Sequence, residues 1–455
     1  MENTISRQIA KFAINLKYED LPDDVIYKVK ELLYDSIGCA FGAYHTKNVN
    51  IIHDIYKNIG GKPEATIIGF GDKIPAVNAS LVNSLMVRSL DFNDIYWKED
   101  PSHPSDIIPA ALAVGEMMNA EMKDVIVAIV LAYEFEMRMC EFAIPGVRER
   151  KWHHATLTQF VSPIVAGKLL ELSEEEMLNA IGINASHNHT IGCPTAGKLT
   201  MMKNTVDPMA VQSGVFAALM AKKGYTGTEA IFEGKEGFMD VFGPGWDINK
   251  LTGKLGENFK ILECGMKAFP SEALTHTHIT AALKAVMENN IKPNDIKEVK
   301  VTAIAKAVDI LFDKNKYEIN SRETADHSLP YCIARAIIDR KITTQSFDEG
   351  KLFDPLLKDL IYKIKGEPSK KFEKMFPEKQ PSQIAIRTKN DKEYKVYLEY
   401  PKGDPREPMT MEDLDNKFNA LSEKLLSKNK RNKIRNTIFN CEHIKAKEFM
   451  KQMII

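Results

Sequence analysis

Apolar residues recur at helical spacing through the first two-thirds of the chain. One such face consists of Val25, Val29, Leu32, Leu33 and Ile37. Spacings of three and four positions place these side chains on one side of a helix, facing a core. The preceding Pro22-Asp23-Asp24 suits the first turn of a helix, where proline and acidic side chains are favoured. Similar stripes predict helices within residues 107–118, 125–139, 160–172 and 210–222.

The pattern changes after about residue 264. Residues 298–302 alternate between apolar and polar side chains, as do residues 384–386 and 394–398 on either side of an Asn390-Asp391 turn. Alternation of period two predicts half-buried strands, and the turn predicts a hairpin. A capping box at Thr410 to Asp413 then precedes a new helical stripe.

These patterns predict a mainly α protein. A large all-helical domain would comprise residues 1–265 and 402–455, and a smaller α+β lid domain, residues 266–401, would be inserted before the C-terminal helices.

Composition narrows the classes of protein. The 455 residues are 44% hydrophobic and 27% charged, with 61 basic against 62 acidic side chains, which is typical of a globular protein and argues against a nucleic-acid binder. The longest apolar run, residues 125–133, is far shorter than the roughly 20 residues of a membrane span. The N-terminus lacks the pattern of a secretory signal, and the six cysteines are far apart. We therefore expect a cytoplasmic protein that contacts neither membrane nor nucleic acid.

Eight of the eleven histidines accompany the candidate chemistry: His103, His153 and His154, His187 and His189, and His276, His278 and His327. Metal binding is one interpretation, because His187/His189 and His276/His278 repeat a two-residue spacing. That spacing puts both rings on one face of a strand, whereas residues 275–283 have the pattern of a helix start. No nearby cysteine or carboxylate completes a tetrahedral ligand set, so we predict no metal site.

Acid–base chemistry is the alternative. His103 follows the carboxylates Asp91 and Asp94, while Lys198 and Lys203 lie in another polar stretch. Histidine is readily poised near neutral pH, and lysines stabilise charge that develops beside a carboxylate. This combination suits an anionic carboxylate substrate.

At these segments the sequence resembles the MmgE/PrpD family, which includes enzymes that dehydrate 2-methylcitrate and enzymes that decarboxylate cis-aconitate. The matching motifs occur in order at residues 33–40, 90–94, 103–106, 166–170, 196–203, 214–219, 232–234, 269–271 and 323–331. Glu-Thr-Ala-Asp-His-Ser-Leu-Pro-Tyr and Phe-Glu-Gly are most similar to the methylcitrate dehydratase branch. The resemblance covers roughly residues 21–418.

The resemblance implies a homodimer with a site between the two domains, a small-molecule di- or tricarboxylate substrate, and no metal, iron–sulfur cluster or other cofactor. Carried over by motif, the catalytic residues would be Asp91, His103, His154, Lys203, His276 and Tyr331. Residues that bind substrate beside them would be His153, Lys198, Asp94 and His327. His154 is preferred over His153 because dehydratase-like members have a similar Trp-Asp-His, in which His153 would fill the Asp position.

The expected reaction is metal-independent dehydration of 2-methylcitrate, as in propionate catabolism. His103 or His154 would serve as base or acid, Lys203 and His276 would hold carboxylates, Tyr331 would donate a hydrogen bond, and Asp91 would orient His103. Ile95 in place of a common Thr, and Ala273-Leu274 near the site histidine, depart from the pattern and bear on the substrate. Decarboxylation of cis-aconitate, epimerisation of a polycarboxylate and a catalytically silent carboxylate-binding protein stay open as alternatives.

Overall fold

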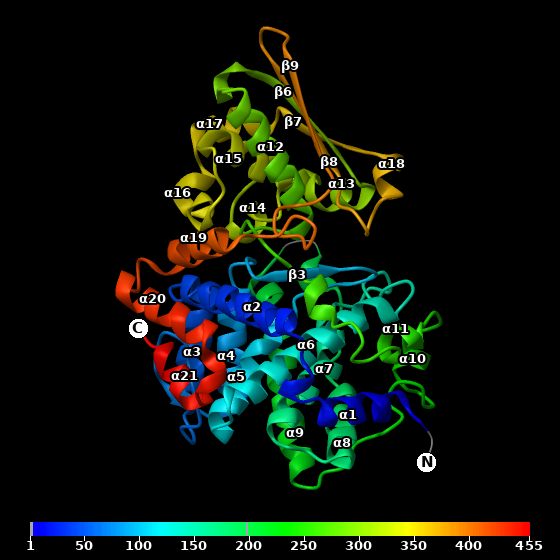
Figure 1. The fold of residues 1–455 in the computed structure, drawn as a ribbon. Coiled ribbons are helices and arrows are strands. Elements are labelled where there is room, and N and C mark those ends of the chain that lie inside the picture. Colours follow the sequence, from blue (N-terminus) through cyan, green and yellow to red (C-terminus); the bar gives the residue numbers. More distant parts are fainter. Residues whose placement is uncertain (1–2, 197–198) are drawn as a thin grey trace.

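The computed structural model describes residues 3–196 and 199–455, which form a larger helical part and a smaller part built on a sheet (Figure 1). The first nine helices of the larger part are α1 (Ile5–Asn15), α2 (Asp23–Gly42), α3 (Lys47–Ile59), α4 (Ala76–Arg88), α5 (Ile108–Met118), α6 (Met122–Phe142), α7 (Ala155–Leu169), α8 (Glu174–Ala185) and α9 (Val206–Lys222). Two short helices follow, α10 (Phe238–Val241) and α11 (Ile248–Thr252), and the chain returns at its end with α19 (Met411–Ser422), α20 (Lys428–Phe439) and α21 (Ala446–Gln452).

The smaller part contains a four-stranded sheet of order β7-β6-β8-β9, with β6 (Ile296–Ala303), β7 (Ile364–Pro368), β8 (Ser382–Thr388) and β9 (Glu393–Leu398). The β6–β7 pair is parallel and the other two pairs are antiparallel. Its helices are α12 (His276–Glu288), α13 (Ala305–Leu311), α14 (Arg322–Ala325), α15 (Leu329–Asp339), α16 (Glu349–Leu352), α17 (Pro355–Ile361) and α18 (Lys370–Glu373). The mainly α fold with a smaller α+β region is therefore confirmed.

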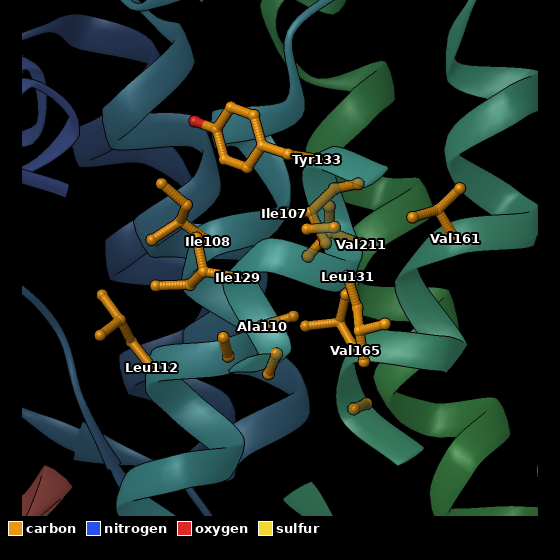
Figure 2. Packing of buried hydrophobic residues seen from close by; sticks show 14 of the residues in the cluster. Ile107, Ile108, Ala110, Leu112, Ile129, Leu131, Tyr133, Val161, Val165 and Val211 are labelled. Carbon is orange, nitrogen blue, oxygen red and sulfur yellow. The ribbon is translucent and has the colours of Figure 1, made fainter. Parts of the chain in front are cut away.

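The core of the larger part lies where α5, α6, α7 and α9 pack together (Figure 2). Every residue of α6 from Val125 to Phe142 is buried, which explains why its sequence is apolar almost all round. Figure 2 shows Ile129 and Leu131 of this helix among side chains of the neighbouring helices, such as Leu112 and Val165. Among the described residues, no helix is both long and apolar enough to cross a membrane.

Two separate hydrophobic clusters support the predicted division of the chain. One cluster contains residues from Ile5 to Met266 and again from Met409 to Met453, and the other contains Trp97 with residues from Ala273 to Ile386. Each cluster buries its own apolar surface, as a domain core does. The boundaries themselves, at 265/266 and 401/402, stay a prediction.

The predicted elements largely coincide with those of the structure, and the differences are instructive. The five helical stripes correspond to α2, α5, α6, α7 and α9, the hairpin corresponds to β8 and β9, and Thr410 caps α19 as its motif predicts. Strand β7 has no sequence signal, because Ile-Lys-Gly-Glu-Pro lacks alternation and ends in proline. A small sheet of order β4-β3-β5 was also missed; its strands are β3 (Asp94–Trp97), β4 (Pro101–Ser102) and β5 (Gly265–Met266). Two further two-residue strands, β1 (Ala65–Thr66) and β2 (Lys73–Ile74), pair with each other.

Candidate active site

The β3–β5 pairing assembles the centre of the candidate site. Asp94 pairs with Met266 and Ile95 with Gly265, so the segments just beyond these strands, at Asp91 and Lys267, lie beside each other. Strand β3 lies at the junction of the two parts of the molecule (Figure 1). A cavity formed here is therefore bordered by both parts.

Asp91 lies at the centre of a group of three cations, which we call the cation cluster: Arg88, Lys203 and Lys267. Lys267 Nζ is 2.8 Å from Asp91 Oδ1 and Lys203 Nζ is 3.0 Å from Asp91 Oδ2, while Arg88 at the end of α4 also forms an ion pair with this carboxylate. All four side chains are buried. Asp91 has a left-handed φ of 51°, a conformation that costs energy in most residues and concentrates at functional sites.

The electrostatics of the cation cluster leave positive charge uncompensated. Burial by itself would raise the pKa of Asp91, but Lys203, Lys267 and Arg88 outweigh it and hold that pKa well below its usual value. Burial lowers the pKa of Lys267, which Asp91 partly offsets. Asp106 lies 3.5 Å from Arg88, and burial raises the pKa of its carboxyl well above the usual range, so it adds little negative charge. Buried charge of one sign is costly, and a bound anion would relieve the cost.

A cavity of about 60 Å³ opens beside Asp91. Its charged and polar lining includes the cation cluster, His103, His154, Arg148, Glu272 and His327. An apolar wall is formed by Ile95, Trp97, Pro101, Ala273 and Ile310. A second cavity of about 280 Å³ shares Ile95, Trp97, Lys267 and Ala273 with the first and is also lined by His276. The two cavities are thus neighbours.

His103 is held as a neutral imidazole. Its Nδ1 lies 2.6 Å from the backbone oxygen of Asp94, a group that only accepts, so Nδ1 carries the hydrogen and Nε2 keeps its lone pair. Burial, with Arg88 and Lys267 adding to it, lowers the pKa of His103 well below its usual value. We expected Asp91 to orient this ring; that expectation is wrong, because the cation cluster surrounds the Asp91 carboxylate and a backbone carbonyl orients His103 instead.

His154 has different surroundings from His103. Its Nε2 lies 3.4 Å from Asp207 Oδ1, and the His103 and His154 rings are 5.7 Å apart between centroids. His154 immediately precedes α7, and Asp207 lies in the first turn of α9, which packs against α7. The side chains of His154 and Asp207 are almost completely buried.

His153, His154 and Asp207 also have ligand atoms within 4.8 Å of one another, close enough to surround a metal ion. The tautomer of His153 opposes this use. Its Nδ1 accepts the backbone N–H of Ala155 at 3.0 Å, so Nε2 carries the hydrogen and has no lone pair for a metal. The arrangement fits a proton-bearing group better than a metal centre.

The structure brings together some of the predicted site residues and separates others. Asp91, His103, His154, Lys203 and His327 all line the smaller cavity, and His276 lines its neighbour. His327 Nδ1 lies 2.5 Å from Asp326 Oδ1, so a carboxylate orients this ring. Lys198 lies outside the described residues.

Three predicted residues lie outside both cavities. The Tyr331 hydroxyl donates to the backbone oxygen of Ser346 at 2.6 Å inside the smaller core, which corrects its expected role as a donor to substrate. The carboxylate of Asp94 accepts the N–H and the hydroxyl of Ser105, so it holds the loop rather than a ligand. His153 lies beside His154, with the two ring centroids 4.0 Å apart.

Sequence reasoning missed Lys267, Arg88 and Asp207. A charged pair three positions apart at the end of an apolar helix was a local signal for Arg88 and Asp91. Lys267 gave no such signal, because its approach depends on the long-range β3–β5 pairing. Asp207 likewise depends on the packing of α7 against α9.

Comparison with known proteins adds independent information. Residues 7–251 match the model of the MmgE/PrpD N-terminal domain, and residues 269–442 match that of the MmgE/PrpD C-terminal domain. The chain is 25% identical over 448 residues to cis-aconitate decarboxylase of Homo sapiens, covering 94% of this chain and 89% of that protein. It is 25% identical over 407 residues to 2-methylcitrate dehydratase of Escherichia coli (strain K12), covering 82% and 81% of the two chains.

Proposed function

Because the chain belongs to the MmgE/PrpD family, we propose that it is a lyase that dehydrates a tricarboxylate, with 2-methylcitrate as substrate and 2-methyl-cis-aconitate as product. Relatives in this family are named as a dehydratase and a decarboxylase, both of which are lyases. The cavity between the two parts of the molecule would hold the substrate.

The cation cluster carries this proposal. Three buried cations contact a single ionised carboxylate, Asp91, so the cation cluster lacks negative charge of its own to balance it. A substrate carboxylate that enters beside Lys203 and Lys267 supplies that charge and gains desolvated ionic contacts. The apolar wall that includes Ile95 and Ala273 offers a place for a methyl substituent.

In the proposed dehydration, His103 and His154 take different roles. The Nε2 lone pair of His103 takes the proton alpha to a carboxylate, and the developing negative charge spreads onto that carboxylate beside Lys203 and Lys267. The carbon–oxygen bond then breaks as the double bond forms, and His154 protonates the departing hydroxyl, which leaves as water.

A panel of substrates tests this proposal. Purified protein in buffer with EDTA is mixed with 2-methylcitrate, citrate or cis-aconitate, and the ultraviolet absorbance of a conjugated double bond is followed. We expect absorbance to rise with 2-methylcitrate, without release of CO2. No change with 2-methylcitrate would overturn the proposed substrate.

Decarboxylation of cis-aconitate is the second candidate. The observation in its favour is that the human relative named for this activity aligns over 94% of this chain, against 82% for the Escherichia coli dehydratase. Here the carbon–carbon bond to one carboxylate breaks, CO2 leaves, and the remaining carbanion takes a proton from His154. Decarboxylation and rehydration both remove the ultraviolet absorbance of cis-aconitate. Trapped CO2 shows which of the two reactions has occurred.

The homodimer and the cytoplasmic location implied by the family resemblance stay predictions. Light scattering of the purified chain would give the oligomeric state directly.

A further inference from the structure

We propose that Asp207 is a positioning residue that acts through His154: its carboxylate forms an ion pair with Nε2 of the ring and leaves Nδ1 to serve as the proton donor in the cavity. This inference rests on the proposed function, because it assigns the acid of that reaction and the group that prepares it.

The contacts of Asp207 are those of a carboxylate dedicated to one imidazole. Oδ1 lies 3.4 Å from His154 Nε2, and within the described part of the chain Oδ2 has no hydrogen-bond partner. The residue is 2% exposed, so water does not solvate its charge. Burial alone would raise the pKa of Asp207, yet His154 outweighs that effect and keeps the pKa well below its usual value. An ionised carboxylate at this depth needs a cationic partner, and His154 is in position to be one.

His153 supports this role by staying neutral. Its Nδ1 accepts the Ala155 N–H, so the ring cannot add a proton there without losing the hydrogen bond. Burial, together with the neighbouring His154, lowers the pKa of His153 well below its usual value. Of the two adjacent imidazoles, His154 is thus the one able to take up the proton that Asp207 stabilises.

Several other charged groups surround His154. Asp207 approaches from α9 and His153 from the preceding residue, while the cavity side presents His103, Arg88, Arg148 and Lys203; Asp100 also acts on this ring. The cations on the cavity side oppose a proton on His154. Asp207 is the buried carboxylate in direct contact with the ring that counters them.

His103 and His154 differ in the groups that contact their rings. His103 is tied to a carbonyl and kept neutral, whereas His154, one ring away, is tied to a carboxylate. One ring is paired with a carbonyl and the other with a carboxylate, so we assign the base to His103 and the acid to His154. The order of base and acid, which the sequence left open, follows from this difference.

The decisive variant is Asp207→Asn, which keeps the shape and removes the charge. We expect kcat with 2-methylcitrate to fall by about 100-fold, the scale of one general acid, with KM changed less than about threefold. The alkaline limb of the kcat–pH profile moves to lower pH, and Asp207→Glu restores part of both effects. Asp348→Asn, at an exposed position in the smaller part, is the matched control and keeps wild-type kinetics.

Two outcomes overturn the inference. One is wild-type kcat and an unshifted profile in Asp207→Asn; the other is a lower kcat with an unshifted profile, which indicates a purely structural role. NMR of histidine-labelled protein tests the same point without substrate: the midpoint of the His154 titration falls in Asp207→Asn, and an unchanged midpoint overturns the inference. Should the wild-type protein turn over none of the tricarboxylates, the proposed function fails while the NMR result still decides the role of Asp207.

Discussion

The Nζ of Lys267 lies 2.8 Å from Oδ1 of Asp91, although 176 positions separate the two residues in the chain. The lysine follows β5, the aspartate precedes β3, and the pairing of these two short strands joins them. Lys267 also lines both cavities, so it is placed to hold a carboxylate of the substrate as well as Asp91.

Lys267→Gln should therefore impair catalysis directly. A hydrogen bond to a charged group contributes about 1.5–3 kcal/mol, so kcat/KM for the tricarboxylate should fall at least about tenfold. Steady-state kinetics with 2-methylcitrate measure the change, and Lys374→Gln, an exposed lysine of the smaller part, serves as the matched control. Equal kinetics in both variants would contradict a role for Lys267 in binding.

Asp91→Asn should destabilise the protein more than its size suggests. The substitution removes the negative charge at the centre of the cation cluster and leaves buried cations unpaired, which costs about 3–5 kcal/mol. Because a bound anion would replace that charge, millimolar citrate should raise Tm more in the variant than in the wild-type protein. Thermal unfolding with and without citrate gives the loss of stability and the citrate-dependent rise in Tm. A variant that unfolds like the wild type would show that the positive charge of the cation cluster is balanced without Asp91.

Stability should fall as pH rises through the neutral range, partly because of Glu136. Burial raises the pKa of this carboxyl to about 8, although Ser102 and Thr158 donate hydrogen bonds that lower it. The folded state then binds more protons than the unfolded state between about pH 4.5 and 8, so the unfolding free energy decreases across that window.

Glu136→Gln should flatten this decline, since the amide keeps an oxygen for Ser102 and Thr158 but does not ionise. We expect the variant to gain a few kcal/mol relative to wild type at pH 8 and little at pH 5, on the scale of about 1.4 kcal/mol for each pKa unit. Urea unfolding at the two pH values measures the unfolding free energy of each protein. An equal change of that free energy with pH in the wild type and the variant would refute the prediction.

Lys417 of α19 should stabilise the backbone that carries the site. Its Nζ forms an ion pair with Asp35 at 2.6 Å and donates to the backbone oxygens of Phe92 and Lys267 at 2.6 and 2.8 Å. Lys417→Met should cost about 3–5 kcal/mol, because Asp35 is left as a buried unpaired carboxylate. Adding Asp35→Asn should recover part of that loss; a double variant no more stable than Lys417→Met would exclude the pairing as the cause.

The sequence predicted what local patterns determine. Helices such as α6 and the β8–β9 hairpin follow from the period of their apolar residues, and the family motifs led to Asp91, His103, His154 and Lys203. Lys267 and Asp207 could not be predicted, because each acts through a partner brought near by tertiary contacts. For Tyr331 the family motif led to a wrong role. Its hydroxyl donates to the backbone oxygen of Ser346 inside the smaller core.

Turnover of 2-methylcitrate by the wild-type protein and by His103→Ala tests the central claim most directly. His103 combines a fixed Nδ1–H with an Nε2 lone pair beside the cation cluster, so removal of its ring should lower kcat at least about 100-fold. His443→Ala, an exposed histidine of the C-terminal region, should match the wild type. We predict that the wild type forms the conjugated product without CO2 and that His103→Ala, folded with a similar Tm, does so barely. Near-wild-type turnover by folded His103→Ala would contradict the account.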